Sequence, residues 1–419
     1  MVGCRLNQAE IEGMARQLRT AGHEIVAAAE SAELAVVNTC SVTAQAASDS
    51  RSKIRRLARL GSAEIVATGC WATLRPAEAA ALPRVSSVVP NQRKDRLVAE
   101  VLRIPAQDLV GEPATRALLP GLRRRTRAFV KVQDGCDNRC TFCIATIARG
   151  KSCSRSVAEV VAEVRAALGG GAKEIVLSGV HLGSWGQDLG LHLKDLILAL
   201  LRDTDAPRVR LSSLEPWDLD AAFFELWEDR RLCDHFHLPL QSGCSSTLKR
   251  MARKTTPSAF WELIRAARDV APDAAITTDV IAGFPGESEN EFRASLDFVR
   301  GMQFAGGHAF TYSPMPGTAA ARMPAQVPLD ARRARNRMFV QAFEEAARAF
   351  RLKNTGKKRR VLWESVTGLG DGRWRLSGLT ENYIRVRAEA GAPRWNEMDD
   401  VELGQEAGDG AAGIIAKTG

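Results

Sequence analysis

The sequence contains no window of about 18 uncharged apolar residues, the length that a membrane-spanning helix needs. Its start also has no apolar stretch typical of a signal peptide. We therefore expect a cytoplasmic protein with no membrane partner. Disulfides are not expected either, because the nine cysteines are odd in number and cytosolic thiols stay reduced. The cysteines are thus candidate metal ligands or buried thiols.

Acidic residues are in the minority, with 49 Asp and Glu against 58 Lys and Arg, and the formal net charge is +9. Basic clusters occupy residues 51–56, 123–125 and 357–360. This balance favours a polyanionic partner such as nucleic acid. The arginine-rich, alanine-rich composition of a high-GC genome gives a similar balance, so charge alone leaves both interpretations open. The length of 419 residues, with 45% of them hydrophobic, predicts a globular protein of two or three domains.

Three cysteines form the most informative motif. Cys136, Cys140 and Cys143 have the spacing C-x3-C-x2-C, and no fourth cysteine completes a tetrahedral set within the run. Three thiolates can hold three corners of a 4Fe–4S cluster and leave one iron open for reaction, whereas structural zinc normally takes four ligands. Phe142 supplies an aromatic face beside this site. The chain resembles the radical S-adenosylmethionine (SAM) superfamily in this motif.

Residues 1–108 have the pattern of a small open α/β domain. Short apolar runs at 34–37 and 65–67 alternate with helical stretches at 8–20 and 44–60. This spacing suits parallel strands joined by crossover helices.

Three further cysteines lie at the ends of these predicted elements. Cys40 and Cys70 follow the two strands, and Cys4 comes directly before the first helix. Loops at the carboxyl ends of parallel strands converge on one crevice. Each cysteine alone is more often a small buried apolar residue. Together they predict a second cluster site.

Residues from about 104 to 126 carry Pro105, Pro113 and Pro120 and are predicted to form a linker. From residue 122 to residue 353, strand–helix repeats predict a (βα)6 partial barrel with its chemistry at the carboxyl ends of the strands. The predicted strands are 128–133, 174–178, 208–212, 235–240, 275–281 and 308–312.

Polar or glycine-rich segments follow these strands, a feature that a purely structural barrel does not need. The radical SAM resemblance makes them candidates for binding SAM, the amino group near Ser178 and Gly179 and the ribose hydroxyls near Glu215 or Asp279. Capping roles are a common alternative for such residues. The complete set of predicted SAM contacts is Phe142, Ser178, Gly179, Ser212, Glu215, Gln241 and Asp279.

Residues 354–419 change in character. Short β-like runs at 361–363, 374–376 and 383–387 alternate with glycine-rich turns, and basic and aromatic residues interleave. This pattern predicts a small β-barrel that binds RNA by stacking and phosphate contacts. The last dozen residues, rich in glycine and alanine, are expected to fray.

Taken together, the chain is similar to the radical SAM methylthiotransferases over essentially its whole length. The matching motifs are GCRLNQAE at 3–10, LSGVHLG at 177–183, LPLQSG at 238–243, TDVIAGFPGE at 278–287 and YSPMPGT at 312–318. The resemblance implies two 4Fe–4S clusters, one on Cys4, Cys40 and Cys70 and a catalytic one on Cys136, Cys140 and Cys143. It also implies a TRAM-like RNA-binding domain at the C-terminus.

The segment Cys4-Arg5-Leu6-Asn7 resembles the branch that acts on threonylcarbamoyladenosine in tRNA. That likeness implies transfer of a methylthio group to the 2-position of the adenine next to the anticodon, with one SAM methylating a held sulfur and another supplying the radical. The implied partners are the anticodon stem-loop, a sulfur donor, and an electron donor such as flavodoxin or ferredoxin, and the expected state is a monomer. The alternatives are the same chemistry on isopentenyladenosine or on a ribosomal-protein aspartate, and a non-catalytic RNA-binding protein with structural metal.

Two departures from the family pattern stand out. Only three residues precede Cys4, where relatives have a β-strand, so we expect either a different start or a first domain without that strand. Ala145-Thr146-Ile147 stands where the family has a proline and an aromatic residue, so the loop after the third cysteine is expected to differ.

Overall fold

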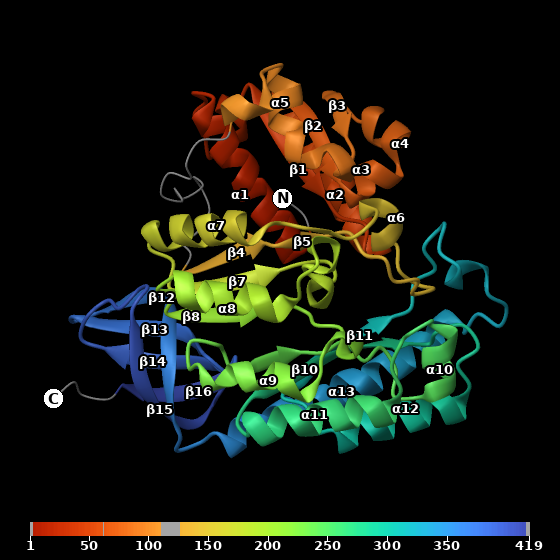
Figure 1. The fold of residues 1–419 in the computed structure, drawn as a ribbon, viewed down its shortest axis with the longest axis vertical. Coiled ribbons are helices and arrows are strands. Elements are labelled where there is room, and N and C mark those ends of the chain that lie inside the picture. The colour runs from red at the N-terminus through yellow and green to blue at the C-terminus, as the bar shows by residue number, and fades with distance from the viewer. Residues whose placement is uncertain (1–2, 62, 110–125, 416–419) are drawn as a thin grey trace.

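The computed structural model describes residues 3–61, 63–109 and 126–415, and Figure 1 shows their arrangement. The basic run 123–125 and most of the expected linker lie outside these ranges. Within them, an N-terminal α/β part, a central set of parallel strands covered by helices, and a C-terminal closed barrel follow one another along the chain.

The N-terminal part holds a parallel sheet with the strand order β1-β2-β3. The predicted helices are present as α1 and α2, and Thr43 caps α2 by accepting a hydrogen bond from the Ala46 N–H. The elements are α1 (Arg5–Thr20), β1 (Leu34–Thr39), α2 (Ala44–Leu60), β2 (Glu64–Gly69), α3 (Cys70–Leu74), α4 (Pro76–Ala80), β3 (Val85–Val89) and α5 (Leu97–Leu102).

The central part is the predicted partial barrel. Two parallel three-stranded sheets, β4-β7-β8 and β9-β10-β11, meet through a parallel bridge between Ser213 and His237. Its elements are β4 (Arg127–Lys131), β5 (Gln133–Asp134), α6 (Ala145–Arg149), β6 (Cys153–Ser154), α7 (Val157–Gly169), β7 (Glu174–Ser178), α8 (Leu193–Asp203), β8 (Arg208–Leu211), α9 (Ala221–Phe224), β9 (His235–His237), α10 (Ser245–Arg250), α11 (Pro257–Val270), β10 (Ala275–Ala282), α12 (Glu289–Gly301), β11 (Gly306–Thr311) and α13 (Leu329–Lys353).

One strand of the barrel is shorter than the sequence predicts. The expected strand 235–240 ends at His237. Pro239 has no N–H to donate, so the ladder with β10 stops there and returns only as an isolated bridge between Gln241 and Val280.

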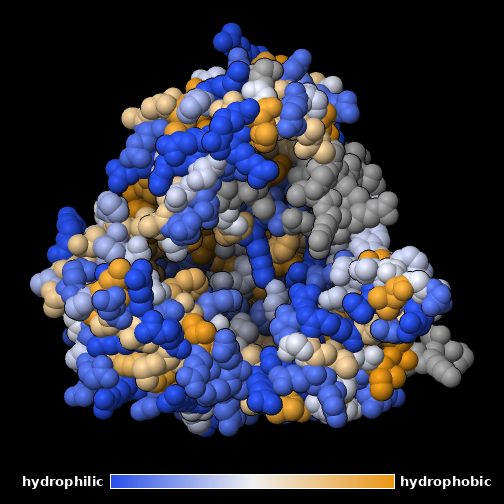
Figure 2. All heavy atoms as spheres, turned by 180° about the vertical axis from the view of Figure 1, so that it is seen from behind, coloured by the Kyte–Doolittle hydropathy of each residue, from blue (hydrophilic) through white to orange (hydrophobic). Residues whose placement is uncertain are grey.

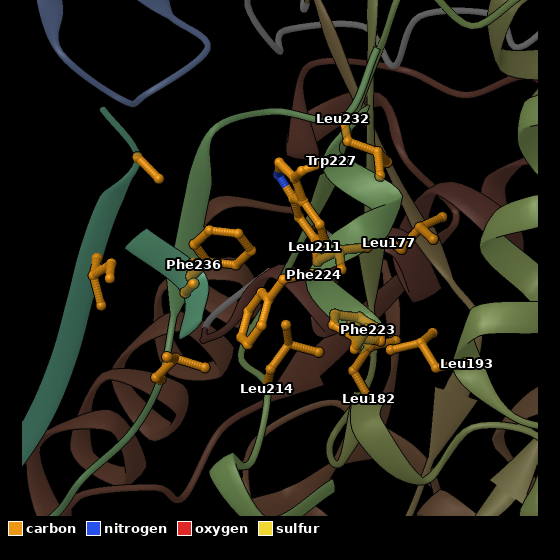
Figure 3. Packing of buried hydrophobic residues seen from close by; sticks show 14 of the residues in the cluster. Leu177, Leu182, Leu193, Leu211, Leu214, Phe223, Phe224, Trp227, Leu232 and Phe236 are labelled. Atoms are coloured by element: carbon orange, nitrogen blue, oxygen red, sulfur yellow. The ribbon is translucent and has the colours of Figure 1, made fainter. Parts of the chain in front are cut away.

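Alternation along each barrel strand separates an apolar outer face from a polar inner face. Outward residues such as Leu177, Leu211 and Phe236 pack in the main core with Phe224 and Trp227, as Figure 3 shows. Each fully buried side chain of this size stabilises the fold by roughly 1.5–3 kcal/mol. The inward residues are largely polar or charged and line the interior of the barrel. Examples are Arg127, Glu174, Arg210, His235, His237 and Asp279.

The C-terminal part is a closed barrel with the strand order β12-β13-β14-β16-β15. Its strands are β12 (Lys358–Gly370), β13 (Arg373–Thr380), β14 (Arg385–Ala390), β15 (Met398–Ala407) and β16 (Gly410–Ile415). The expectation that the last dozen residues fray is wrong for residues 410–415, because β16 pairs with both β15 and β14 and closes the barrel.

Helix α1 connects the N-terminal part to the central barrel. Ala9 on α1 packs with Phe129 and Val176 on the inner face of β4 and β7, and Figure 1 shows α1 running toward β4. Figure 2 shows the rear face of the molecule hollowed near its middle. In the described ranges, no helix is both long and apolar enough to cross a membrane.

Candidate active site

The three predicted cluster cysteines lie in the loop between β5 and α6. Gly135 starts this loop with a φ of +68°, and a Cβ there would come within 1.8 Å of the Lys151 carbonyl oxygen, so only glycine fits. The Cys136 N–H donates to the Gly150 carbonyl over 3.0 Å, and the Cys143 N–H donates to the Cys140 carbonyl over 3.0 Å. The loop is therefore held in shape by its own backbone.

Burial and nearby donors set the properties of these thiols. Burial raises the pKa of Cys140 to about 11, and Arg253, whose Nη1 lies 3.9 Å from the sulfur, opposes this rise. Burial likewise raises the pKa of Cys143, against hydrogen bonds from backbone N–H groups of Thr146 and Ala145. Cationic and N–H donors directed at sulfur are what bound thiolates need, and cluster binding would release protons here.

The surroundings of the loop fit SAM as well as a cluster. A cavity of about 320 Å³ lies against Cys140 and Cys143 and is also lined by Gly317 and Thr318. Three buried polar atoms nearby have no hydrogen-bond partner: Ser212 Oγ, Trp217 Nε1 and Arg253 Nε. Unpaired buried polar groups are costly, so they indicate a place for a polar ligand.

Glu215, a predicted SAM contact, joins the cluster loop through Arg253. Its carboxylate lies 2.6 Å from Arg253 Nη2, and the same guanidinium reaches Cys140 and stacks on Trp217 with 4.3 Å to the ring centroid. Sequence reasoning missed Arg253, which stands 113 residues from Cys140 in the chain. No local motif marks that pairing.

The predicted SAM contacts Ser178, Gly179, Phe142 and Gln241 lie in different parts of the barrel. Ser178 ends β7 and Gly179 follows it, and a Cβ at Gly179 would come within 2.8 Å of Gln133 Oε1, so this strand end packs closely against β5. Phe142 makes an edge contact with Phe284 at 6.4 Å between ring centroids. Gln241 adopts a φ of +72°, a strained conformation for a residue with a side chain.

Asp279 lies in a histidine cluster on the inner face of β10. Its two carboxylate oxygens are 3.3 Å from His237 Nε2 and 3.1 Å from His308 Nδ1. Burial would raise its pKa, but the hydrogen bonds from His237 and His308 lower it to about 2. The carboxylate is therefore an anion here, and these pairings place its side chain among imidazoles.

His181 supports the first cysteine of the loop. Its Nε2 lies 2.5 Å from Asp218, and Asn138 lies 3.3 Å from its Nδ1. Burial opposes the charged form, yet the hydrogen bonds that His181 donates to Asp218 and Cys136 raise its pKa to about 9. These contacts indicate that His181 helps to fix the shape of the loop.

The three N-terminal cysteines come together at the carboxyl edge of the sheet. Burial raises the pKa of Cys40, and Cys4 and Cys70 are close enough to add to the rise. Gly3 packs against this site, because a Cβ there would lie 2.9 Å from Cys40 Sγ. In the described part of the chain, no three His, Cys, Asp or Glu side chains converge on a single metal ion. A 4Fe–4S cluster places each thiolate on its own iron, so its ligands need not converge on one ion.

Asn91 connects Cys70 to helix α6, which follows the cysteine loop. Asn91 donates from Nδ2 to the Ala148 carbonyl over 2.8 Å, and the same nitrogen lies 3.6 Å from Cys70 Sγ. Ala148 belongs to α6, the helix that begins two residues after Cys143.

A buried ion network locks the two sites together. Glu10 on α1 accepts from Lys94 over 2.8 Å and from Arg149 over 2.9 Å, and Arg149 also binds Asp134 and Asn7. A buried pair of this kind is strongly destabilising to break. The N-terminal part is thus held rigidly against the cluster loop.

Comparison with known proteins agrees with this geometry. Residues 130–299 match the Radical SAM superfamily, and residues 1–90 match the uncharacterized protein family UPF0004. A cysteine loop at the carboxyl end of a partial barrel and these matches define the class, a radical SAM enzyme.

Relatives identify the family within that class. A Thermotoga maritima protein, threonylcarbamoyladenosine tRNA methylthiotransferase MtaB, is 35% identical over 397 residues, which cover 91% of this chain and 89% of the relative. An Erythrobacter litoralis tRNA-2-methylthio-N(6)-dimethylallyladenosine synthase is 34% identical over 389 residues, which cover 89% and 87%. The chain belongs to the radical SAM methylthiotransferase family and resembles its MtaB-type members. It is therefore an enzyme, and its family implies SAM and a 4Fe–4S cluster.

A solved structure supports the fold alone. The radical SAM methyltransferase TsrM from Kitasatospora setae has a TM-score of 0.54 with 18% sequence identity, and the match covers 68% of this chain and 64% of that one.

Proposed function

We propose that the protein adds a methylthio group to the 2-position of N6-threonylcarbamoyladenosine, next to the anticodon of tRNA. The observation that carries this proposal is the pair of three-cysteine sites that Asn91 and the Glu10–Arg149 pair hold against each other. One site per cluster suits a reaction that needs a radical and a held sulfur. The relatives of known name include both threonylcarbamoyl and dimethylallyl enzymes at similar identity.

Each cysteine site has residues suited to its part of the proposed reaction. Cys136, Cys140 and Cys143 would hold the cluster that, with SAM bound, supplies the radical, and Arg253, Glu215 and Ser212 would orient the SAM. Cys4, Cys40 and Cys70 would hold the second cluster. The His237–Asp279–His308 group lies on the inner face, where it can bind or exchange a proton with the nucleoside.

The division of labour follows the division of the chain. We assign residues 1–108 to sulfur placement, residues 122–353 to radical chemistry and residues 354–419 to RNA binding. Sulfur and electron donors would act on the chain as separate partners, and the protein would work as a monomer in the cytoplasm.

Mass spectrometry of tRNA nucleosides tests the proposal. The gene is expressed in cells that lack their own threonylcarbamoyladenosine methylthiotransferase. The expected result is the methylthio form of threonylcarbamoyladenosine. Two other products would overturn the substrate assignment. One is methylthio-isopentenyladenosine in cells that lack their own isopentenyladenosine methylthiotransferase, and the other is a methylthiolated ribosomal-protein aspartate.

Two cysteine variants separate the two sites. Cys140→Ala should abolish reductive cleavage of SAM, because the cluster would lose one of its three thiolate ligands. Cys40→Ala should keep SAM cleavage and stop methylthio transfer. Cys244→Ala, a thiol outside both sites, is the matched control. Both activities are measured by quantifying 5′-deoxyadenosine and modified RNA, and methylthio transfer by Cys40→Ala would contradict the two-cluster assignment.

A further inference from the structure

The inner face of the barrel near α1 carries more positive than negative charge. Arg127 pairs with Glu364 at 2.7 Å, while Arg208 and Arg210 share the single carboxylate of Glu174. Arg208 Nη2 lies 2.9 Å from the Glu174 carboxylate, and Arg208 Nε has no hydrogen-bond partner. The region therefore favours an anionic ligand.

Arg5 differs from these arginines because it has no carboxylate partner among the described residues. It follows Cys4 directly, and its side chain is exposed. Nη2 donates to the Tyr383 hydroxyl over 2.6 Å, and the guanidinium lies 5.6 Å from the Phe129 ring centroid. These two aromatic side chains hold the guanidinium in place, and its remaining N–H donors are available to a ligand.

The position of Arg5 links the N-terminal cysteine site to the barrel interior. Phe129 lies on the inner face of β4, where it packs against α1. Across the interior, a hydrogen bond with Asp279 raises the pKa of His308, and burial and the nearby charge of Arg5 act against that rise. Arg5 therefore extends from the residue after Cys4 into the interior of the barrel, toward His308.

Three buried or partly buried basic side chains around the sites are already paired with carboxylates. Lys131 lies 2.8 Å from Asp134, Arg149 binds Glu10, and Arg253 binds Glu215. Recruiting any of them to a substrate would break an existing buried pair, which costs several kcal/mol. Arg5 has no such pair to lose.

We propose that Arg5 binds the carboxylate of the threonylcarbamoyl group and thereby selects this nucleoside, an inference that rests on the proposed function. The threonyl substituent ends in a carboxylate, whereas a dimethylallyl substituent is apolar and uncharged. A guanidinium recognises a carboxylate through two parallel hydrogen bonds. The ureido N–H of the substituent can hydrogen-bond to adenine N1, which adjoins C2, so the carboxylate and C2 share one edge. In the chain, Arg5 likewise adjoins Cys4, a proposed cluster ligand.

A double-mutant cycle on RNA binding tests the assignment. The reconstituted enzyme and its Arg5→Gln variant bind synthetic anticodon stem-loops that carry either threonylcarbamoyladenosine or the analogue with a carboxamide in place of the carboxylate. The wild type should bind the acid about 10- to 100-fold more tightly than the amide, the range for a charge-assisted hydrogen bond. Arg5→Gln should bind both with the affinity of the wild type for the amide, and Arg5→Lys should recover part of the preference. Arg56→Gln, an exposed arginine on α2, is the control for phosphate contacts.

Each outcome decides between specific alternatives. Equal weakening of both RNAs by Arg5→Gln, as expected of Arg56→Gln, would mean that Arg5 contacts a phosphate and would overturn the assignment. A wild type that methylthiolates the acid RNA without preferring it over the amide would overturn the inference and leave the proposed function intact. A wild type that modifies only dimethylallyl RNA would overturn both. Iron and sulfide contents of each variant establish that the clusters are unchanged.

Discussion

At the residue scale, Glu174 shows how a buried charge is tied to acid stability. It is fully buried and pairs with Arg210 at 2.7 Å and with Arg208 at 2.9 Å. Burial would raise its pKa, but the two arginines lower it to about 2. A carboxyl whose pKa falls on folding stabilises the protein above its unfolded pKa, and this stabilisation is lost as pH falls toward the folded pKa.

We therefore expect the wild type to lose about 2 kcal/mol more free energy of unfolding than Glu174→Gln between pH 5 and pH 3. Urea unfolding at both pH values measures the difference, and any loss of clusters in acid is common to both proteins. Glu291→Gln removes a carboxylate that is paired with Arg250 but more exposed, so it should change the acid dependence less. An equal acid dependence in wild type and Glu174→Gln would contradict the role of this pair.

Individual site residues are the features that could least be predicted from the sequence. The six cysteines could be proposed as cluster ligands from the sequence because their spacing and their places at strand ends are local. Arg253 and the pair His181–Asp218 could not, because each acts through a contact between residues far apart in the chain. Asp279 was selected as a polar residue at a strand end, but its histidine partners become visible only once β10, β9 and β11 lie side by side.

At the element scale, the junction between β2 and α3 positions Cys70. Gly69 has a φ of +94°, and a Cβ there would lie 2.3 Å from the Thr39 carbonyl oxygen and 2.5 Å from Asn38 Oδ1. Gly69→Ala should push the end of β2 away from β1 and so move Cys70 away from Cys40. Iron analysis should then show one cluster instead of two, with SAM cleavage retained.

Gly22→Ala is the matched control for this change. Gly22 also has a positive φ, +85°, but nothing lies within 4 Å of the position of a Cβ. Alanine there should cost only the backbone strain of about 1–2 kcal/mol and leave the iron content unchanged. Full iron content in Gly69→Ala would show that Cys70 tolerates the displacement.

Helices and strands with a strong hydrophobic or capping pattern could be predicted from the sequence, whereas those without such a pattern could not. Six barrel strands follow from apolar runs between helices, and Ser156 and Ser288 form capping boxes at α7 and α12. Strand β16 has the sequence Gly-Ala-Ala-Gly-Ile-Ile, which carries little β propensity, and it forms because pairing with β14 and β15 closes the barrel.

At the scale of the whole molecule, the basic run 357–360 serves two purposes that the sequence does not separate. Lys357 and Arg359 bind Asp273 and so dock the C-terminal barrel on the central part. Lys358 and Arg360 are exposed, and the described residues include no carboxylate paired with either. Alternation along the start of β12 thus directs one pair to the protein and the other to solvent.

Salt dependence of tRNA binding should distinguish these pairs. A protein that neutralises phosphates releases counterions, so its affinity falls with salt, with a slope that grows by about 0.7–0.9 for each phosphate contact. The double variant Lys358→Gln/Arg360→Gln should lower this slope by about 1–2 and leave thermal stability unchanged. Lys357→Gln/Arg359→Gln should instead lower the melting temperature, because Asp273 loses both partners, and should keep the slope of the folded protein. If the outward pair leaves the slope unchanged, the C-terminal barrel contacts RNA through another face, and its basic charge serves only to dock it.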